Sequence, residues 1–220
     1  MKAPRDLLIR PTMPNPAPSQ IQRRLLISTR NAHKVDEIRE ILGSNFIISD
    51  LSALSGFPEM EETGFTFQEN AAIKALAASA RFDGWVIADD SGLEVDALNG
   101  APGIRSARFS GESSTDASNR ALLLEKLISV RGKSRSARFR CVISLARQGE
   151  ILANFSGSVE GVIIPQEKGT GGFGYDSLFV PDGHCETFAQ LGSEIKNSLS
   201  HRARALSELK NWPNWDTAPI

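Results

Sequence analysis

The chain has 220 residues, a formal net charge of −1, and a composition that is 40% apolar and 23% charged. These values are typical of a globular protein and argue against one that mainly coats nucleic acid or a membrane surface. No apolar run approaches the ~20 residues that span a bilayer, and the two cysteines suit neither a disulfide framework nor a metal site. We therefore expect a cytoplasmic protein whose partners include no membrane and no nucleic acid.

Residues 1–24 differ from the rest of the chain. They are rich in proline, contain Asp6 as their only acid, and lack the apolar core of a secretory signal. We interpret them as a flexible N-terminal extension, with an organellar targeting segment as the alternative. A single domain is expected over residues 25–220.

This domain begins with the pattern of an α/β unit. A short apolar strand is predicted over residues 25–29, followed by a polar loop and a helix whose apolar face carries Val35, Ile38 and Ile41. Gly43 is expected to end this helix, and a second strand follows. Strand, helix and strand in this order open an α/β fold.

A capped helix and a strand with two carboxylates come next. Residues 67–81 predict an alanine-rich helix with Thr66 as its N-cap. The stretch VIADDSGL, residues 86–93, places three apolar residues before Asp89 and Asp90, and its Ser-Gly pair is expected to form the turn that ends the strand. Ligands gather at the carboxyl ends of strands in α/β proteins, so these carboxylates are candidates for chemistry. Simple capping of a strand end is the alternative.

The second half of the chain predicts a helix, a long β-hairpin, a short strand and a final helix. In order, these elements cover residues 114–130, residues 137–146 and 151–164 around a Gln148-Gly149 turn, residues 178–180, and residues 200–209. Ile128 is placed in the apolar stripe of the first of these helices. The whole pattern predicts an α/β fold with a mixed central sheet and a long β-hairpin, flanked by helices and arranged as two lobes.

The loop GTGGFG, residues 169–174, satisfies the spacing G-x-G-x-x-G, but its context argues against a dinucleotide fingerprint. That motif lies between a strand and a helix, whereas Pro165 precedes this loop and residues 175–180 predict a strand after it. No P-loop sequence occurs in the chain. We interpret the loop as a glycine-rich turn that lets Phe173 and Asp176 approach a ligand closely.

Two polar segments near predicted helix starts offer donors for an anion. STRNAHK, residues 28–34, supplies hydroxyl, amide and ammonium groups beside the backbone N–H groups of a helix start, which suits a polyphosphate. An ordinary N-cap by Asn31 with a solvated lysine is the alternative. Near the C-terminus, Lys196 and Ser200-His201-Arg202 form a second set of donors.

Four segments carry a resemblance to a known family. In chain order, TFQENAAIKA, ADDSGLEVDALNGAPGIRSARFSG, GTGGFGYD and KNSLSHR closely resemble the pyrophosphatases that hydrolyse inosine and xanthosine triphosphates. The resemblance runs from about Leu25 to the final helix. Ser28 and Arg30 stand where small or glycine-like residues are usual, Ser177 replaces a proline, and Ile195 replaces an acid. None of these departures removes a proposed ligand group, although Arg30 lies in the phosphate-binding segment.

The resemblance implies a nucleoside triphosphate pyrophosphatase domain with two lobes around a nucleotide cleft. The implied reaction is hydrolysis of non-standard purine nucleoside triphosphates (ITP, dITP and XTP) to the monophosphate and pyrophosphate with Mg²⁺, by a homodimer. Strand geometry sends Asp89 and Asp90 to opposite faces of the sheet. By resemblance, Asp90 is the metal ligand and catalytic base, whereas Asp89 is expected to face away and stabilise its surroundings. Glu61 is the expected second metal ligand, with Glu62 as the alternative.

The expected substrate-binding residues come from the same motifs. They are Thr29, Arg30, Asn31, Ala32, His33, Lys34, Ser91, Phe173, Gly174, Tyr175, Asp176, Lys196, His201 and Arg202. The side chains of Thr29, Asn31 and Lys34, together with Lys74, would neutralise phosphate charge. Phe173 would stack on the base. Hypoxanthine and xanthine present an O6 acceptor and an N1–H donor, so a site built for these groups would reject adenine by as much as ~10⁴-fold.

Two other functions remain open from the residues. One is a pyrophosphatase for modified pyrimidine nucleotides. The other is a non-catalytic nucleotide- or RNA-binding module that uses the basic strand near residues 131–140 and the C-terminal helix. The second alternative predicts no metal-dependent turnover and a steep dependence of binding on salt.

Overall fold

The structure, a computed structural model, describes residues 23–130 and 135–215. The predicted extension therefore lies outside the described residues, except for Arg23 and Arg24, with which the first strand begins. The first strand begins two residues before the boundary expected at residue 25. In these two ranges no helix combines the length and the apolar character that crossing a bilayer requires.

Six strands and five α-helices are formed by the described residues. The strands are β1 (Arg23–Ile27), β2 (Phe46–Asp50), β3 (Trp85–Val95), β4 (Ser136–Arg147), β5 (Glu150–Ile163) and β6 (Phe179–Pro181). The helices are α1 (Ala32–Leu42), α2 (Phe67–Ser79), α3 (Asp116–Lys126), α4 (Phe188–Leu199) and α5 (His201–Lys210). A 3₁₀ segment spans Gly103–Arg108.

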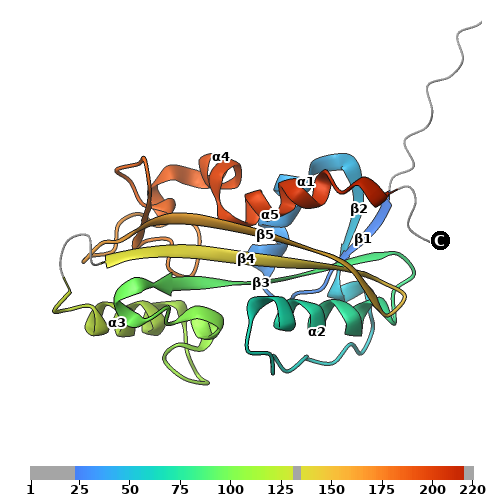
Figure 1. The fold of residues 1–220 in the computed structure, drawn as a ribbon, viewed down its shortest axis with the longest axis horizontal. Coiled ribbons are helices and arrows are strands. Elements are labelled where there is room, and N and C mark those ends of the chain that lie inside the picture. Colours follow the sequence, from blue (N-terminus) through green and yellow to red (C-terminus); the bar gives the residue numbers. More distant parts are fainter. Residues whose placement is uncertain (1–22, 131–134, 216–220) are drawn as a thin grey trace, which may run out of the picture.

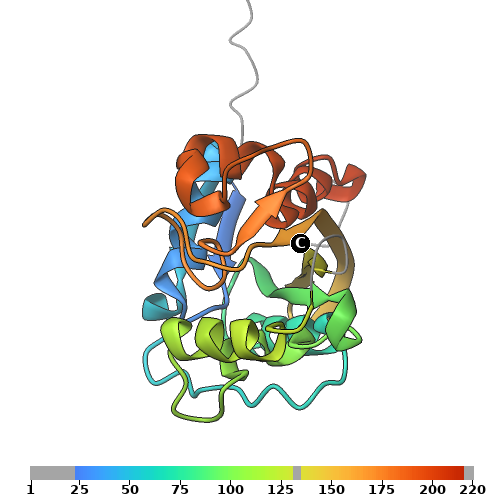
Figure 2. The same ribbon diagram turned by 90° about the vertical axis from the view of Figure 1, so that its left-hand side faces the viewer.

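The strands form one mixed sheet in the order β2-β1-β3-β4-β5-β6. β1 pairs in parallel with β2 and β3, and the remaining neighbours are antiparallel. Helices α1, α4 and α5 cover one face of the sheet, and α2 and α3 cover the other, as Figures 1 and 2 show from two directions. The predicted α/β class, with its mixed sheet, long hairpin and flanking helices, is confirmed.

Local sequence signals account for several of these elements. Asn31 caps α1 by accepting a hydrogen bond from the backbone N–H of Lys34, and Val35 and Ile38 are buried on the inner face of this helix. Thr66 caps α2 in the same way. The β4–β5 hairpin turns at Gln148 and Gly149, whose φ angles of 51° and 81° suit the type I′ turn of a two-residue hairpin loop.

The Ser-Gly pair of VIADDSGL does not end its strand, and that prediction is wrong. β3 continues to Val95, and Ser91 and Gly92 pair with Cys141 and Arg140 of β4. Gly92 serves a close approach instead of a turn. A Cβ atom there would lie 2.4 Å from the carbonyl oxygen of Gly103, a contact that only glycine avoids.

Three other predictions need correction. The third helix ends at Lys126 instead of residue 130, and Ile128, placed in its apolar stripe, is 81% exposed. Residues 175–178 precede the strand, which begins at Phe179. Helix α4 was not expected; it contains Gly192, whose φ of 80° interrupts the helical dihedrals, and a glycine inside a helical pattern weakens the prediction of a helix.

The strand lengths place an opening beside β3. The pairing of β1 with β3 ends at Ile27 opposite Ile87, and the chain then turns into the loop before α1. β3 continues for eight residues beyond this point, from Ala88 to Val95. The carboxyl end of β1 therefore lies beside the edge of β3 that β1 leaves unpaired, where side chains project from either face of β3. This is the expected position of a ligand site in an α/β sheet.

Candidate functional site

A cavity of about 370 Å³ lies at this place, between the two helical layers. It is lined by Asp90 and by most of the predicted substrate-binding residues, which are Thr29, Arg30, Asn31, Lys34, Ser91, Phe173, Gly174, Tyr175, Asp176, Lys196, His201 and Arg202. Ala32 lines a neighbouring hollow instead, and His33 contacts the site through Phe173. The structure thus brings together residues from the loop before α1, from β3, and from the C-terminal third of the chain.

The two carboxylates of β3 lie on opposite faces, as predicted. Asp90 faces α2, where its Oδ1 lies 3.2 Å from the Nζ atom of Lys74. Asp89 faces α1 and α5, where it pairs with Lys34 and accepts a 3.0 Å hydrogen bond from the Nε atom of Arg202. Asp89 does stabilise its surroundings, but it does so by anchoring two predicted substrate-binding cations.

The environment of Asp89 keeps this carboxylate charged. The side chain is buried, which opposes ionisation, but the charges of Arg202 and Lys34 outweigh burial and hold the pKa of Asp89 well below its usual range. Ser91 Oγ and Cys141 Sγ donate further hydrogen bonds to it, at 3.1 Å and 2.9 Å. A carboxylate with four donors has little capacity left to bind a metal ion or to accept a proton.

Asp90 has the opposite character. Burial raises the pKa of Asp90, against the lowering effect of Lys74 and Lys34. Its Oδ2 atom is buried and has no hydrogen-bond partner among the described residues. Buried carboxylate oxygens are normally satisfied, so an unpaired one inside a polar cavity points to a group that binds there.

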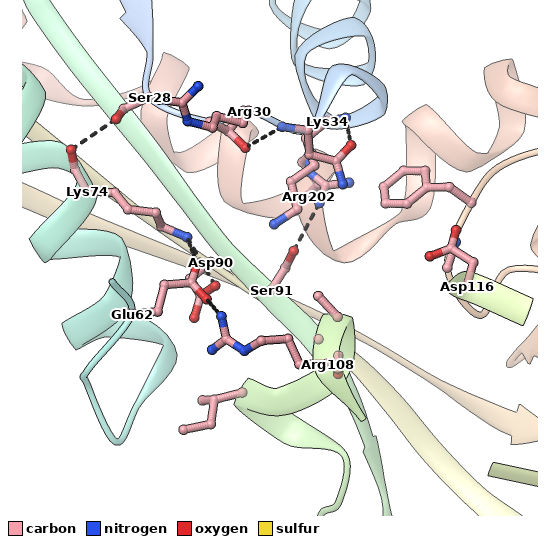
Figure 3. A pocket seen from close by; sticks show the side chains of 18 of the residues that line it. Ser28, Arg30, Lys34, Glu62, Lys74, Asp90, Ser91, Arg108, Asp116 and Arg202 are labelled. Atoms are coloured by element: carbon pink, nitrogen blue, oxygen red, sulfur yellow. Dashed lines mark hydrogen bonds and ion pairs between the residues drawn. The ribbon is translucent and has the colours of Figure 1, made fainter. Parts of the chain in front are cut away.

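Glu62, not Glu61, faces Asp90. Lys74 joins the two carboxylates, because its Nζ atom lies 2.7 Å from Oε1 of Glu62 as well as 3.2 Å from Asp90 (Figure 3). Arg108 contacts the other oxygen of Glu62 at 3.2 Å. Burial opposes ionisation of Glu62, but Lys74 outweighs it and lowers the pKa of Glu62. Glu61 is exposed and does not line the cavity.

This pair of carboxylates fits a small divalent ion. Among the described residues, no group of three or more His, Cys, Asp or Glu side chains forms a complete metal site. Mg²⁺, however, is usually bound by one or two carboxylates, and phosphate and water oxygens complete its shell. The unpaired Asp90 Oδ2 and the nearby Glu62 supply such a pair.

The other end of the cavity is aromatic and cationic. The ring of Phe173 stacks on His33, with centroids 5.3 Å apart, and the Nζ atom of Lys196 lies 4.6 Å from the Phe173 centroid. Asp176 accepts hydrogen bonds from the backbone N–H of Phe173 at 2.9 Å and from Lys196 at 2.6 Å. Burial raises the pKa of Asp176, although Lys196 opposes that effect.

Sequence reasoning missed Glu37 of α1. Its carboxylate pairs with Lys196 at 2.5 Å and with Arg202, so it holds both cations at once. A signal for it was present, because Glu37 follows Lys34 by one helical turn and three-residue spacing places two side chains on the same face. Arg30 also has an unexpected partner, since its guanidinium donates a 2.7 Å hydrogen bond to the carbonyl oxygen of Phe57.

His201 is a neutral, buried residue of the site. Its ring stacks on Phe139, with centroids 4.9 Å apart. Burial, and secondarily the charges of Arg202 and Lys196, hold the pKa of His201 well below its usual value. Its Nδ1 atom is buried without a hydrogen-bond partner among the described residues, which makes this atom available to a ligand.

The neutral state of His201 predicts a pH dependence of stability. In the unfolded chain this histidine gains a proton as the pH falls below about 6.5, whereas in the folded chain it stays neutral. The free energy of unfolding should therefore fall below pH 6.5, with His201 contributing up to about 1.4 kcal/mol per pH unit. Urea unfolding at pH 7.5, 6.5 and 5.5 should show this contribution in the wild type and not in His201→Gln. His184→Gln, at an exposed position, is the control and should keep the wild-type slope; an unchanged slope in His201→Gln would contradict the assignment.

Comparison with known proteins identifies relatives of this chain. The Ham1 family model matches residues 25–212. The dITP/XTP pyrophosphatase of Geobacter sulfurreducens is 48% identical over 193 residues, 87% of this chain and 97% of that protein. The dITP/XTP pyrophosphatase of Bacillus subtilis is 42% identical over 190 residues, 86% of this chain and 96% of that protein.

A solved structure has the same fold. The HAM1 protein from Coxiella burnetii superposes with a TM-score of 0.77 at 38% sequence identity, covering 86% of this chain and 98% of that one. The resemblance that the motifs carried is thereby confirmed over nearly all of the described residues. The chain belongs to the Ham1 family.

Proposed function

We propose that this protein hydrolyses non-standard purine nucleoside triphosphates, such as ITP, dITP and XTP, to the monophosphate and pyrophosphate. The relatives named above are dITP/XTP pyrophosphatases. The observation that carries the proposal is the position of Asp90, whose buried, unpaired Oδ2 atom lies beside Glu62 and Lys74 in a cavity whose other end is aromatic. One end thus suits phosphate chemistry, and the other suits a base.

Mg²⁺ is part of this proposal. Asp90 and Glu62 would hold the ion, and when bound it would neutralise charge on the phosphates as the leaving group departs. Lys74 would then be free to contact the substrate, because its present partners are these same two carboxylates. In the ion-free site its ammonium group is charged, because burial opposes the charged form but Asp90 and Glu62 outweigh burial and raise the pKa of Lys74.

The protein's own residues provide the remaining steps. Water would attack the α-phosphorus while the Asp90 carboxylate orients it and accepts its proton, and the bond to the pyrophosphate oxygen would break. Lys34 and the backbone N–H groups at the start of α1 would stabilise the phosphate charge.

The base would be read at the aromatic end. Phe173 offers a face for stacking, Lys196 and Arg202 are donors for O6, and Asp176 is an acceptor for N1–H. Adenine carries the reverse pattern and would leave these groups unpaired, a mismatch that costs ~10⁴-fold in comparable sites. Guanine shares O6 and N1–H, so its rejection would depend on crowding at its exocyclic amine.

A homodimer in the cytoplasm also belongs to the proposal. The family resemblance implies the dimer, and two cysteines in 220 residues favour a reducing compartment. Sedimentation velocity of the full chain measures the assembly directly. A species of about 48 kDa, twice the 23.9 kDa of one chain, supports the dimer, and a monomer at micromolar concentration contradicts it.

A substrate panel tests the proposed activity. Pyrophosphate release from dITP, XTP, GTP, dTTP and ATP is measured with Mg²⁺, with and without EDTA. We expect dITP and XTP to be cleaved at least 100-fold faster than ATP and EDTA to abolish turnover. Faster cleavage of dTTP would support a pyrimidine pyrophosphatase instead. Absence of pyrophosphate with every substrate would support a non-catalytic binding module.

The neighbouring glutamates provide a matched test of the metal site. Glu62→Gln should weaken Mg²⁺ binding by 10-fold or more, measured by calorimetry without nucleotide, because it removes one of the two carboxylates that face the cavity. Glu61→Gln is the control and should bind Mg²⁺ like the wild type, since Glu61 is exposed outside the cavity. Weaker Mg²⁺ binding by Glu61→Gln than by Glu62→Gln would instead identify Glu61 as the ligand.

A further inference from the structure

Helix α3 holds both backbone hydrogen-bonding groups of one residue of the glycine-rich loop, Gly174. The backbone N–H of Gly174 donates a 2.7 Å hydrogen bond to Asp116 Oδ2, and the carbonyl oxygen of Gly174 accepts a 2.9 Å hydrogen bond from Arg120 Nη1. Asp116 and Arg120 lie four residues apart at the start of α3 and therefore project from the same face of the helix. We call this pair of side chains the α3 clasp.

Two features make the grip specific to this loop conformation. Gly174 has a φ of 61°, in the left-handed region that favours glycine, although no atom would obstruct a Cβ there. The conformation, rather than space, requires the glycine. Arg120 Nε also donates a 2.8 Å hydrogen bond to Glu167, and Glu167 accepts a 2.9 Å hydrogen bond from Ser177. The clasp thus holds the last residue of the loop and, through Glu167, is linked to the segments that precede and follow the loop.

Gly174, which the clasp holds, directly follows Phe173, whose ring lies at the aromatic end of the cavity. Asp176, two residues after Gly174, accepts hydrogen bonds from Phe173 N–H and from Lys196. α3 lies on the opposite side of the sheet from α4 and α5 (Figure 1). The clasp therefore connects the layer of α3 to the residues that would stack on and read the base.

The clasp is remote from the carboxylates. Figure 3 shows Asp116 at one end of the pocket and Lys74, Glu62 and Asp90 at the other. Both Asp116 and Gly174 line the cavity. A change at Asp116 should therefore alter the base end and leave the phosphate end in place.

From this geometry we propose that Asp116 and Arg120 are positioning residues that set the placement of Phe173 and so control affinity and selectivity for the purine base. The inference rests on the proposed function and deepens it. Charged partners on the N–H and on the C=O of Gly174 restrain the two peptide units that flank this residue, and so fix the position and the direction of the chain next to Phe173. Without them, the ring of Phe173 would have to be ordered by the substrate, and binding would weaken.

The test compares Asp116→Ala and Arg120→Ala with the wild type. We expect KM for ITP to rise about tenfold and kcat to change less than twofold, as occurs when binding is lost equally from ground and transition states. Inhibition by IMP should weaken about tenfold, whereas inhibition by pyrophosphate, which probes the phosphate end, should not change. The preference for ITP over ATP should also fall. Asp116→Asn keeps an acceptor oxygen and should recover most of the wild-type KM.

Thr115→Ala separates positioning from helix stability. Thr115 caps α3 by accepting a 3.1 Å hydrogen bond from the N–H of Ser118, whereas the hydrogen bond from Gly174 N–H goes to Asp116. This variant should lower the unfolding midpoint while leaving KM and IMP inhibition unchanged. Equal losses for IMP and pyrophosphate, a wild-type KM in Asp116→Ala, or the same KM change in Thr115→Ala would each overturn the proposal.

Calorimetric titration with IMP distinguishes failure of the clasp from failure of the proposed function. If the wild type releases no pyrophosphate from ITP, the proposed function fails. IMP binding tenfold weaker to Asp116→Ala than to the wild type would still support the clasp. Equal IMP binding to both proteins, or no binding to either, would overturn it.

Discussion

Asp90→Asn is expected to lower kcat for ITP hydrolysis by about 10³-fold, within the range for loss of a general base at a metal-assisted site. An amide has no oxygen that accepts a proton from water at neutral pH, and it is a poor ligand for Mg²⁺ compared with a carboxylate. The fold should persist, because Lys74 keeps its pairing with Glu62. The variant also replaces a buried carboxyl group, whose pKa is raised by burial, with a neutral amide.

Three measurements check this prediction. Pyrophosphate release gives kcat, calorimetry gives Mg²⁺ affinity, and thermal unfolding should give a midpoint at or above that of the wild type. The control is Asp83→Asn, which changes a carboxylate that is 92% exposed and 3.6 Å from Arg24. It should leave all three values unchanged. Near wild-type turnover in Asp90→Asn would remove Asp90 from the mechanism.

Asp89→Asn is expected to lower the free energy of unfolding by about 3 kcal/mol, the lower end of the cost of breaking a buried ion pair. Asp89 is 1% exposed and is the partner of both Lys34 and Arg202. The amide cannot neutralise them, so the buried Arg202 and the partly buried Lys34 would both lose this counter-charge, and of the two only Arg202 also pairs with Glu37. The large effect follows from the charges left behind rather than from the lost bonds.

Urea unfolding of the Asp89→Asn variant measures this loss. Asp96→Asn is the matched control, because Asp96 also pairs with an arginine, Arg138, at 2.9 Å, but its side chain is 49% exposed. A surface pair of this kind contributes about 0–1 kcal/mol, so the two variants should differ clearly. Equal destabilisation by both substitutions would show that burial of the Asp89 pairs has no special role.

Most of the local structure could be predicted from the sequence, because its causes are local. The apolar spacing of Val35 and Ile38 predicted α1, and Thr66 marked the start of α2. The Gln148-Gly149 turn predicted the hairpin, since two adjacent residues adopt positive φ there. In each case the residues that decide the structure are within a few positions of one another.

Local signals failed where a distant partner decides the structure. A Ser-Gly pair is typical of a turn, yet Ser91-Gly92 stays in β3 because β4 pairs with it across about 50 residues of chain. Glu61 and Glu62 could not be distinguished for the same reason. Two adjacent glutamates look alike in sequence, and only the positions of Lys74 and Arg108 identify which of them faces the cavity.

The sequence by itself determined the family, the α/β class, and the identity of most residues that line the cavity, because each motif carries its own residues in a fixed order. VIADDSGL also predicted that its two carboxylates would face opposite ways, since side chains alternate along a strand. Only the tertiary structure decided what each carboxylate does. Asp89 meets Arg202, 113 residues away, and is saturated by donors, whereas Asp90 meets Lys74 and keeps one buried oxygen unpaired. Partners so distant in the chain meet only through packing of the sheet and its helices, which no local pattern records.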